Sequence, residues 1–419
     1  MSLPRYLEYK DTGIAWLGHI PTHWKVCALK RVASLKSGES IDAEQIEETG
    51  PFPVYGGNGL RGFTTAFSHE GRYPLIGRQG ALCGNINYSS GRFWASEHAV
   101  VATPTRPVDI TWLGELLRYM NLNQYSVSAA QPGLSVEAVS RLVVPYPPHE
   151  EQKAIGAFLD RETAKIDVLI AEQEKLLTLL AEKRQATISH AVTRGLNPDA
   201  PMKDSGVTWV GEVPKHWKIV RLGTLFREVN EPGHEDLPVL SVSIHDGVSD
   251  KELDESELDR KVSRSDDKSK YKAVQPGDLT YNMMRAWQGG FGSVAVQGMV
   301  SPAYVVARPT SEFITSHVEM LLRTPKAVLE MKRHSRGITD FRLRLYWEEF
   351  KTIQVALPPK DEQSEIGAFI DAEVIKLDEL QSAAEATITL LKERRSALIA
   401  AAVTGQIDVR NAAPQEQAA

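Results

Sequence analysis

The residues of this chain with the clearest chemical potential are cations and aromatic side chains gathered around one glycine. The segment from Met331 to Tyr346 contains three cations before Gly337 and two after it, together with Phe341 and Tyr346. The cations are Lys332, Arg333, Arg336, Arg342 and Arg344. Cations neutralise phosphate groups, and Arg, Asn and Gln side chains hydrogen-bond to base edges. This combination indicates a nucleic-acid contact surface.

Further polar and basic residues occur on segments that we predict to be loops. In the first half they are Asn58, Arg61, Arg78, Gln79, Asn85 and Gln131, and in the second half Tyr281, Asn282, Arg285 and Gln288. Any one of them would also suit a solvated surface. The joint pattern makes these residues candidate DNA contacts.

Sequence motifs for catalysis are absent. The chain has no GxxxxGK[ST] loop, no GxGxxG after a strand, no HExxH and no adenine-methyltransferase signature. His23 and His216 each precede a tryptophan, and such a pair is more typical of a linker anchor than of proton transfer. We therefore expect no catalysis by this chain alone, no metal and no cofactor of its own.

The chain contains two repeated motifs, which indicate a duplication. The residues from Trp16 to Trp24, WLGHIPTHW, return from Trp209 to Trp217 as WVGEVPKHW. PHEEQKAIGAFLDRE, starting at Pro148, returns as PKDEQSEIGAFIDAE, starting at Pro359. Each unit is therefore expected to consist of a globular domain and a long helix.

The long helices are predicted from apolar residues that recur at alternating steps of three and four, as in a coiled coil. Proline pairs mark their starts, and Gly195 and Gly405 mark their ends. A helix of this kind with about 45 residues extends ~67 Å. The residues expected to pack between the helices are Ile155, Leu159, Ile166, Leu169 and Leu180, with Ile366, Ile370, Leu377, Leu380 and Leu391 in the second helix.

Between the repeated motifs, short runs punctuated by Gly, Pro and Asn predict short strands and turns. Helical stretches are expected at 111–125 and 316–333, and an exposed insertion at 251–272. The fold class is therefore α+β, with two pseudo-symmetric globular domains separated by a pair of long helices.

The order of the repeats is cyclic: the second WxGxxPxHW motif follows the first long helix, so cutting the chain at another point would give the same two units. Units related by a two-fold axis would place the helices antiparallel and the chain termini beside one domain. The expected divisions are an N-terminal segment (1–24), a first domain (25–145), a central helix (146–194), a linker (195–216), a second domain (217–357), a C-terminal helix (358–405) and a disordered tail (406–419).

Composition describes an ordinary globular protein of 419 residues with a formal net charge of −6. Residues 25–145 carry 11 basic and 10 acidic side chains and residues 217–357 carry 20 of each, so the acidity lies in the helices. No apolar run approaches the ~20 residues of a membrane span, and residues 1–11, MSLPRYLEYKD, lack the apolar segment of a signal peptide. Two cysteines, Cys27 and Cys83, do not predict a disulfide framework. We expect a cytoplasmic protein without membrane contact.

Taken together, the duplicated WxGxxPxHW and PPxxEQxxIGxFxDxE motifs make the chain resemble the specificity subunits of type I restriction-modification systems. The segments Val54–Gly59 (VYGGNG) and Ile76–Ala81 (IGRQGA) are also similar to turns of that family, whereas the second half lacks them. The resemblance implies a non-catalytic subunit with two target-recognition domains, each reading one half of a divided double-stranded DNA sequence. It also implies that the helices set the spacer and dock two methyltransferase subunits that bind S-adenosylmethionine, with two restriction (nuclease and translocase) subunits in systems that cleave.

Two other interpretations remain open at this stage. A coiled-coil scaffold whose domains bind protein would lack sequence-selective DNA binding and a steep salt dependence. A DNA-acting enzyme with an unrecognised site would methylate or cleave DNA as the purified chain alone.

Overall fold

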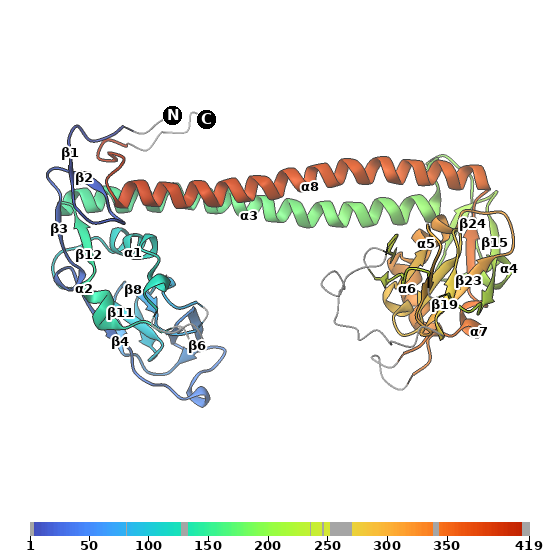
Figure 1. Ribbon diagram of the computed structural model, residues 1–419, viewed down its shortest axis with the longest axis horizontal. Coiled ribbons are helices and arrows are strands. Elements are labelled where there is room, and N and C mark those ends of the chain that lie inside the picture. The colour runs from blue at the N-terminus through green and yellow to red at the C-terminus, as the bar shows by residue number, and fades with distance from the viewer. Residues whose placement is uncertain are drawn as a thin grey trace. The chain divides into compact units, whose positions relative to one another are not determined.

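The computed structural model describes residues 4–80, 82–126, 133–234, 236–244, 247–251, 270–337 and 343–412 (Figure 1). The chain forms two compact units, the first built from two stretches of sequence and the second from one. Unit 1 comprises residues 1–175 and 384–419, and unit 2 comprises residues 176–383.

Within the described ranges, unit 1 contains two four-stranded sheets and two short strand pairs. The sheets have the orders β6-β5-β10-β7 and β4-β11-β8-β9, and the pairs are β1-β2 and β12-β3. The strands are β1 Tyr9–Asp11, β2 His19–Pro21, β3 Lys25–Ala28, β4 Ala33–Ser37, β5 Phe52–Gly56, β6 Gly59–Thr64, β7 His69–Glu70, β8 Pro74–Gly77, β9 Ile86–Tyr88, β10 Arg92–Ala95, β11 Ala99–Pro104 and β12 Val143–Tyr146.

Short helices connect these strands and cover the core of unit 1. They are η1 Leu29–Arg31, η2 Ala43–Gln45, α1 Ile110–Tyr119, η3 Leu122–Tyr125 and α2 Val136–Arg141. Trp24 and Trp112 are fully buried in this core together with Leu159 from the long helix that follows. The expected helical stretch at 111–125 is therefore divided into α1 and η3, with Asn121 between them at a positive φ of 45°.

The described residues of unit 2 form a four-stranded sheet, β16-β23-β20-β21, and the two-stranded pairs β13-β14, β15-β24, β17-β18 and β19-β22. The strands are β13 Met202–Asp204, β14 Glu212–Pro214, β15 Lys218–Arg221, β16 Phe226–Val229, β17 Val242–Ser243, β18 Gly247–Val248, β19 Lys272–Val274, β20 Leu279–Asn282, β21 Phe291–Ser293, β22 Gly298–Val300, β23 Tyr304–Pro309 and β24 Gln354–Leu357.

The helices of unit 2 correct one prediction. Besides α4 Leu222–Leu225, η5 Ala286–Gln288 and α7 Trp347–Phe350, the unit has α5 Thr315–Leu322 and α6 Pro325–His334 in place of one helix over 316–333. The break falls where Thr324 accepts a hydrogen bond from the backbone N–H of Ala327, with Pro325 in the first turn. A proline at this position starts a helix but cannot continue one.

The two units repeat one topology although their sequences diverge between the motifs. The sheet β4-β11-β8-β9 of unit 1 corresponds strand for strand to β16-β23-β20-β21 of unit 2, and the pairs β3-β12 and β1-β2 correspond to β15-β24 and β13-β14. The register agrees as well, since Pro104 pairs with Ala33 and Pro309 with Phe226. The connection between β8 and β9 therefore corresponds to that between β20 and β21.

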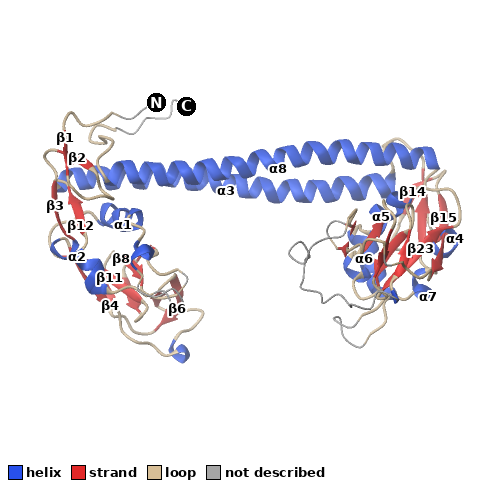
Figure 2. Cartoon of the chain, in the orientation of Figure 1, coloured by secondary structure: helices blue, strands red, loops and turns tan. Residues whose placement is uncertain are grey.

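The long helices are α3 His149–Arg194 and α8 Lys360–Val403, and they pack on each other (Figure 2). Within unit 1, Arg395 of α8 pairs with Asp167 of α3 at 2.8 Å, and within unit 2, Arg184 of α3 pairs with Asp378 of α8. These pairings run in opposite directions along the two helices. The predicted α+β class with an antiparallel helix pair is confirmed.

The predicted helix contacts are mostly buried, with two errors at equivalent positions. Ile155, Leu159, Ile166, Leu180, Ile366, Ile370 and Leu377 are buried, and Leu391 is half-buried. Leu169 and Leu380 are exposed, so their assignment to the helix contact was wrong. Ile170, half-buried, takes the position predicted for Leu169, and Ala384 is the next buried residue of α8 after Leu377.

Each long helix ends against the repeated tryptophan motif. Gly195 follows α3 with a φ of 75°, and Gly405 closely follows α8 with a φ of 74°, a conformation that favours glycine. A Cβ atom on Gly405 would lie 2.9 Å from the Trp24 ring, and one on Gly195 would lie 3.4 Å from Trp217. These glycines both stop the helices and make room for the motif.

The chain termini meet in unit 1, as the cyclic repeat predicted. The N–H of Asp408 donates to the carbonyl of Pro4 at 2.8 Å, and the Tyr9 hydroxyl donates to the carbonyl of Gln406. Val409 is buried in the core. The expected disorder of residues 406–412 is therefore wrong, because this segment closes the unit, and residues 413–419 lie outside the described part of the chain.

Candidate nucleic-acid interface

The two repeated motifs bind each other through one glutamate in each unit. Glu151 accepts hydrogen bonds from Trp24 Nε1 at 2.7 Å and from the Tyr6 hydroxyl at 3.2 Å, and its other oxygen lies 2.7 Å from His23 Nε2. In unit 2, Glu362 accepts from Trp217 Nε1 at 3.0 Å and lies 2.6 Å from His216 Nε2. The histidines are thus anchors, as the sequence indicated.

The glutamine that follows each glutamate fixes the domain to the same helix turn. Gln152 donates to the carbonyl of Pro147 at 2.9 Å and accepts from the backbone N–H of Asp109, just before α1. Gln363 repeats both contacts with Pro358 and Ile314, just before α5. The Glu-Gln pair of each long helix therefore sets the orientation of its domain.

Within unit 1, two turns that carry candidate residues meet a third turn that carries none. They are the β5–β6 turn at Gly57-Asn58, the β8–β9 loop at 78–85 and the β10–β11 turn at 96–98. The backbone N–H of Arg78 donates to the carbonyl of His98 at 2.9 Å. A Cβ atom on Gly77 would lie 2.2 Å from the carbonyl of Gly57, so glycine is required for this close approach.

The side chains predicted for unit 1 lie on these turns. Asn85 donates to Asn58 at 3.2 Å, Arg78 donates to Ser37 at 3.2 Å, and Gln79 contacts His98. Asn58, Arg61, Gln79 and Asn85 are exposed and Arg78 is half-buried. The structure therefore brings Asn58, Arg78, Gln79 and Asn85 together, whereas Arg61 lies on β6 with its aliphatic part against Gly56.

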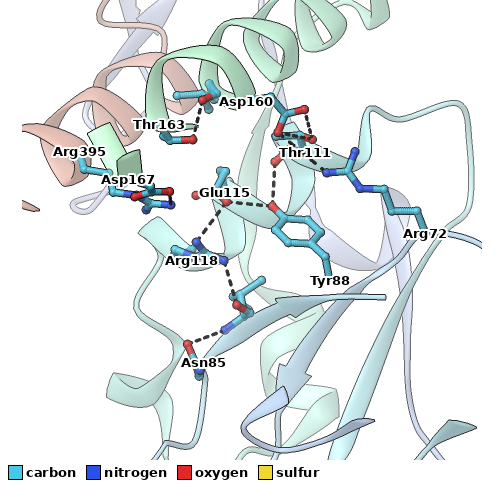
Figure 3. A network of polar contacts seen from close by, with 12 residues as sticks. Arg72, Asn85, Tyr88, Thr111, Glu115, Arg118, Asp160, Thr163, Asp167 and Arg395 are labelled. Carbon is cyan, nitrogen blue, oxygen red and sulfur yellow. Dashed lines mark hydrogen bonds and ion pairs between the residues drawn. The ribbon is translucent and has the colours of Figure 1, made fainter. Parts of the chain in front are cut away.

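A buried polar network holds the β8–β9 loop to helix α3 (Figure 3). Thr111 donates to Asp160 of α3 at 3.1 Å and accepts from the Tyr88 hydroxyl through its carbonyl, and that hydroxyl also donates to Glu115 at 3.0 Å. Arg118 contacts Glu115 and donates to the carbonyl of Ile86, next to Asn85. Burial, together with the Glu115 charge, raises the pKa of Tyr88, so its hydroxyl stays a donor.

In unit 2 the equivalent loop, between β20 and β21, carries the candidates Arg285 and Gln288, and Asn282 ends β20 just before it. Both loops contain eight residues, 78–85 and 283–290. Asn282 accepts from the backbone N–H of Met284 at 2.9 Å and shapes the turn, and Gln288 is exposed. Tyr281 is fully buried, and burial raises its pKa well above the usual value, so its assignment as a DNA contact was wrong.

The basic segment, which begins in the last turn of α6 and continues beyond it, lies beside this loop. Lys332 lies 5.6 Å from the centre of the Trp287 ring, and the N–H of Leu345 donates to the carbonyl of Met283. Arg333 and Arg336 are exposed and pair with Glu330 and Glu349. The backbones of Arg336 and Arg344 hydrogen-bond to each other, so these two residues of the predicted basic segment lie side by side.

Some predictions fall outside the described residues. These are the candidates Gln131 and Arg342 and most of the expected insertion at 251–272. Over the described ranges, no group of three or more His, Cys, Asp or Glu side chains could hold a metal, and no helix is long and apolar enough to cross a membrane. Cys27 and Cys83 are free thiols.

Sequence reasoning missed Glu97 and His98, which lie beside Gln79, and the Tyr88–Glu115–Arg118 network. A candidate list built from basic and amide residues passes over a lone Glu-His pair in a turn. Glu115 is buried on an amphipathic helix, and nothing in the local pattern distinguishes it from a solvated charge.

Comparison with known proteins agrees with this architecture. Residues 21–178 match the sequence profile of the type I restriction modification DNA specificity domain. Over 137 residues, 32% of this chain and 34% of the relative, the chain is 43% identical to the EcoprrI specificity subunit of Escherichia coli. It is 23% identical to a putative specificity subunit of Haemophilus influenzae over 77% of this chain and 80% of that one.

Solved structures show the same fold. The specificity subunit from Thermoanaerobacter tengcongensis aligns with a TM-score of 0.50 and 16% identity over 93% of this chain and 98% of that chain. A second solved chain aligns with a TM-score of 0.57 and 15% identity over 92% of this chain and 98% of that chain. It comes from a structural study of complex assembly and conformational transition of the type I restriction-modification system.

The chain shares the fold of solved type I specificity subunits. Residues 21–178 form a type I restriction modification DNA specificity domain, and the chain as a whole is similar to type I restriction-modification specificity (S) subunits, which are the non-catalytic subunits of those enzymes.

Proposed function

We propose that each unit binds one half of a divided double-stranded DNA sequence through its central hairpin loop. The observation that carries this proposal is the correspondence of the β8–β9 and β20–β21 loops. Both loops have eight residues and the same place in equivalent sheets, and both carry amide and cationic side chains. A loop held on a rigid sheet can vary in sequence without disturbing the fold, which suits residues that select a target.

The candidate DNA contacts divide between base edges and phosphates. Amide side chains on the loops, Gln79 and Asn85 in unit 1 and Asn282 and Gln288 in unit 2, suit base edges. The exposed Arg333, Arg336 and Arg344 suit phosphates, although Arg333 and Arg336 also pair with the largely buried carboxylates of Glu330 and Glu349.

The partners and cofactors belong to the same proposal. The chain would assemble with two methyltransferase subunits that bind S-adenosylmethionine and, in a system that cleaves, with two restriction subunits. The long helices would dock the methyltransferases and set the spacer between the two half-sites. Several large apolar side chains on the outer faces of α3 and α8, among them Val168, Leu179 and Leu390, support a docking role.

Methylation mapping tests the function directly. The chain is co-expressed with the methyltransferase encoded beside it in a host without DNA methylation, and modified adenines are mapped by long-read sequencing. We expect one divided motif with a modified adenine in each half. A stable purified complex that produces no new methylation would contradict the proposal and favour the protein-binding scaffold.

The spacer role has its own test. Inserting seven residues into both long helices adds about 10 Å to each. We expect the spacer of the methylated motif to lengthen while both half-sequences stay unchanged. An unchanged spacer with full methylation would show that the helices do not set it.

A further inference from the structure

Gln79 contacts a histidine from a neighbouring turn at one end of its amide, and a glutamate contacts that histidine in turn. His98 Nδ1 lies 3.1 Å from Gln79 Oε1, and His98 Nε2 lies 3.1 Å from Glu97 Oε1. The backbones are fixed together as well, because the N–H of Arg78 donates to the carbonyl of His98. The three side chains therefore form a chain of contacts from Glu97 through the imidazole to the amide.

This arrangement fixes the amide and leaves half of it available. The carboxylate of Glu97 accepts from His98 Nε2–H and the amide oxygen of Gln79 accepts from His98 Nδ1–H, so the two contacts together orient the ring. One end of the Gln79 amide contacts that ring, and the side chain is otherwise exposed. A glutamine immobilised at one end loses less conformational entropy on binding and presents its remaining hydrogen-bonding group in one direction.

The equivalent positions in unit 2 support a role in recognition. With Gly77 equivalent to Asn282, Gln79 corresponds to Met284, which is exposed, and Glu97 and His98 correspond to Pro302 and Ala303. The two folds thus carry the Glu-His pair where the loop presents an amide and lack it where the loop presents an apolar side chain. If the pair served the shared fold, unit 2 would be expected to need it too.

We propose that Gln79 reads one base pair in the half-site of unit 1, and that His98 and Glu97 are positioning residues for its amide. This inference rests on the proposed function. With its oxygen on His98, the amide presents its –NH2 donor, which is suited to the N7 acceptor on the major-groove edge of a purine. His98 and Glu97 would act through Gln79 and contact no base themselves.

The test compares base preference in variants of the co-expressed complex. Gln79→Met keeps the length of the side chain and copies the residue found in unit 2. We expect the methylated fraction at sites differing from the motif at one position of the unit 1 half to rise, with discrimination at that position falling about tenfold. The half-site of unit 2 should be unchanged. Gln45→Met, on an exposed turn of the same unit, should leave the whole motif as in the wild type.

The positioning role is tested by Glu97→Gln and His98→Ala. We expect both to weaken discrimination at the same base pair that Gln79→Met affects, and by a smaller factor. A structural role would instead lower methylation at all sites alike. An unchanged motif with Gln79→Met would overturn the base-reading role, and an effect of Glu97→Gln at a different base pair would overturn the positioning role. If the wild-type complex yields no divided motif, the proposed function itself fails.

Discussion

Trp24 donates its indole N–H to Glu151 at 2.7 Å, although the two residues are 127 positions apart in the sequence. This bond joins the two motifs that the sequence repeats, and Trp217 and Glu362 form the same bond in unit 2. The motifs recur together because each supplies the other's partner. The anchor also places the globular domain at a defined position on its helix, which a reader of divided DNA requires.

Removing the first anchor should destabilise the protein more than removing the second. Glu151→Ala leaves the buried Trp24 N–H and the Tyr6 hydroxyl without an acceptor, so we expect a loss of about 3 kcal/mol in the free energy of unfolding. Glu362 is more exposed, and its replacement should cost less. Urea denaturation measures both. The neighbouring Glu150→Ala, on a solvated side chain, is the control, and an equal loss in all three variants would contradict the anchor role.

Equivalent glycines in the two helices should respond in opposite ways to alanine. A Cβ atom on Gly156 would lie 2.2 Å from Asp109 Oδ1, which caps α1 by accepting from the N–H of Trp112. Gly156→Ala should therefore cost about 1–3 kcal/mol through overpacking and loss of the cap. Gly367 has no atom within 4 Å of such a Cβ, so Gly367→Ala should gain up to about 1 kcal/mol of helix propensity.

Thermal and urea unfolding of the two alanine variants decides this prediction. If Gly367→Ala were as destabilising as Gly156→Ala, the repeated glycine would serve the helix itself and not the contact with Asp109.

Unit 2 should lose stability in mild acid because of one histidine. His317 is fully buried, and burial lowers its pKa from 6.5 to about 4. The unfolded chain therefore binds a proton more readily than the folded chain between these values. The contribution of the neutral ring is complete above pH 6.5 and is lost as the pH falls towards 4, by up to about 3 kcal/mol.

Unfolding free energies measured from pH 7 to pH 4 test this point. His317→Leu should flatten the dependence over this window, whereas the same change at His190, an exposed residue of α3, should leave it as in the wild type. A wild-type slope that persists in His317→Leu would assign the acid sensitivity to another group.

Sequence patterns were sufficient to predict the two long helices and the order of the units. The repeated glutamates, tryptophans and glycines form the contacts on which the architecture depends, so the motifs report it directly. The seam between the helices was misassigned at Leu169 and Leu380, because Leu169 and Ile170 are adjacent apolar residues and steps of three and four from Ile166 fit equally well.

The correspondence between the β8–β9 loop of unit 1 and the β20–β21 loop of unit 2 was not predictable from sequence. The β8–β9 and β20–β21 loops are equivalent through strand pairing, and Gln79 and Met284 occupy the same place without sharing chemistry. Tyr281 was mistaken for a contact because it adjoins Asn282 at the end of a strand, where successive side chains point to opposite faces. Glu97 and His98 acquire meaning from the turn that faces them, which a linear sequence does not display.

The most direct test of the account is an exchange of the first recognition domain. Residues 25–145 are replaced by the corresponding domain of a specificity subunit with a different target, and methylated adenines are mapped in the co-expressed complex. The account predicts a new sequence in one half of the divided motif, with the other half and the spacer unchanged. A change in both halves, or in neither, would contradict the reading of one half-site by each unit.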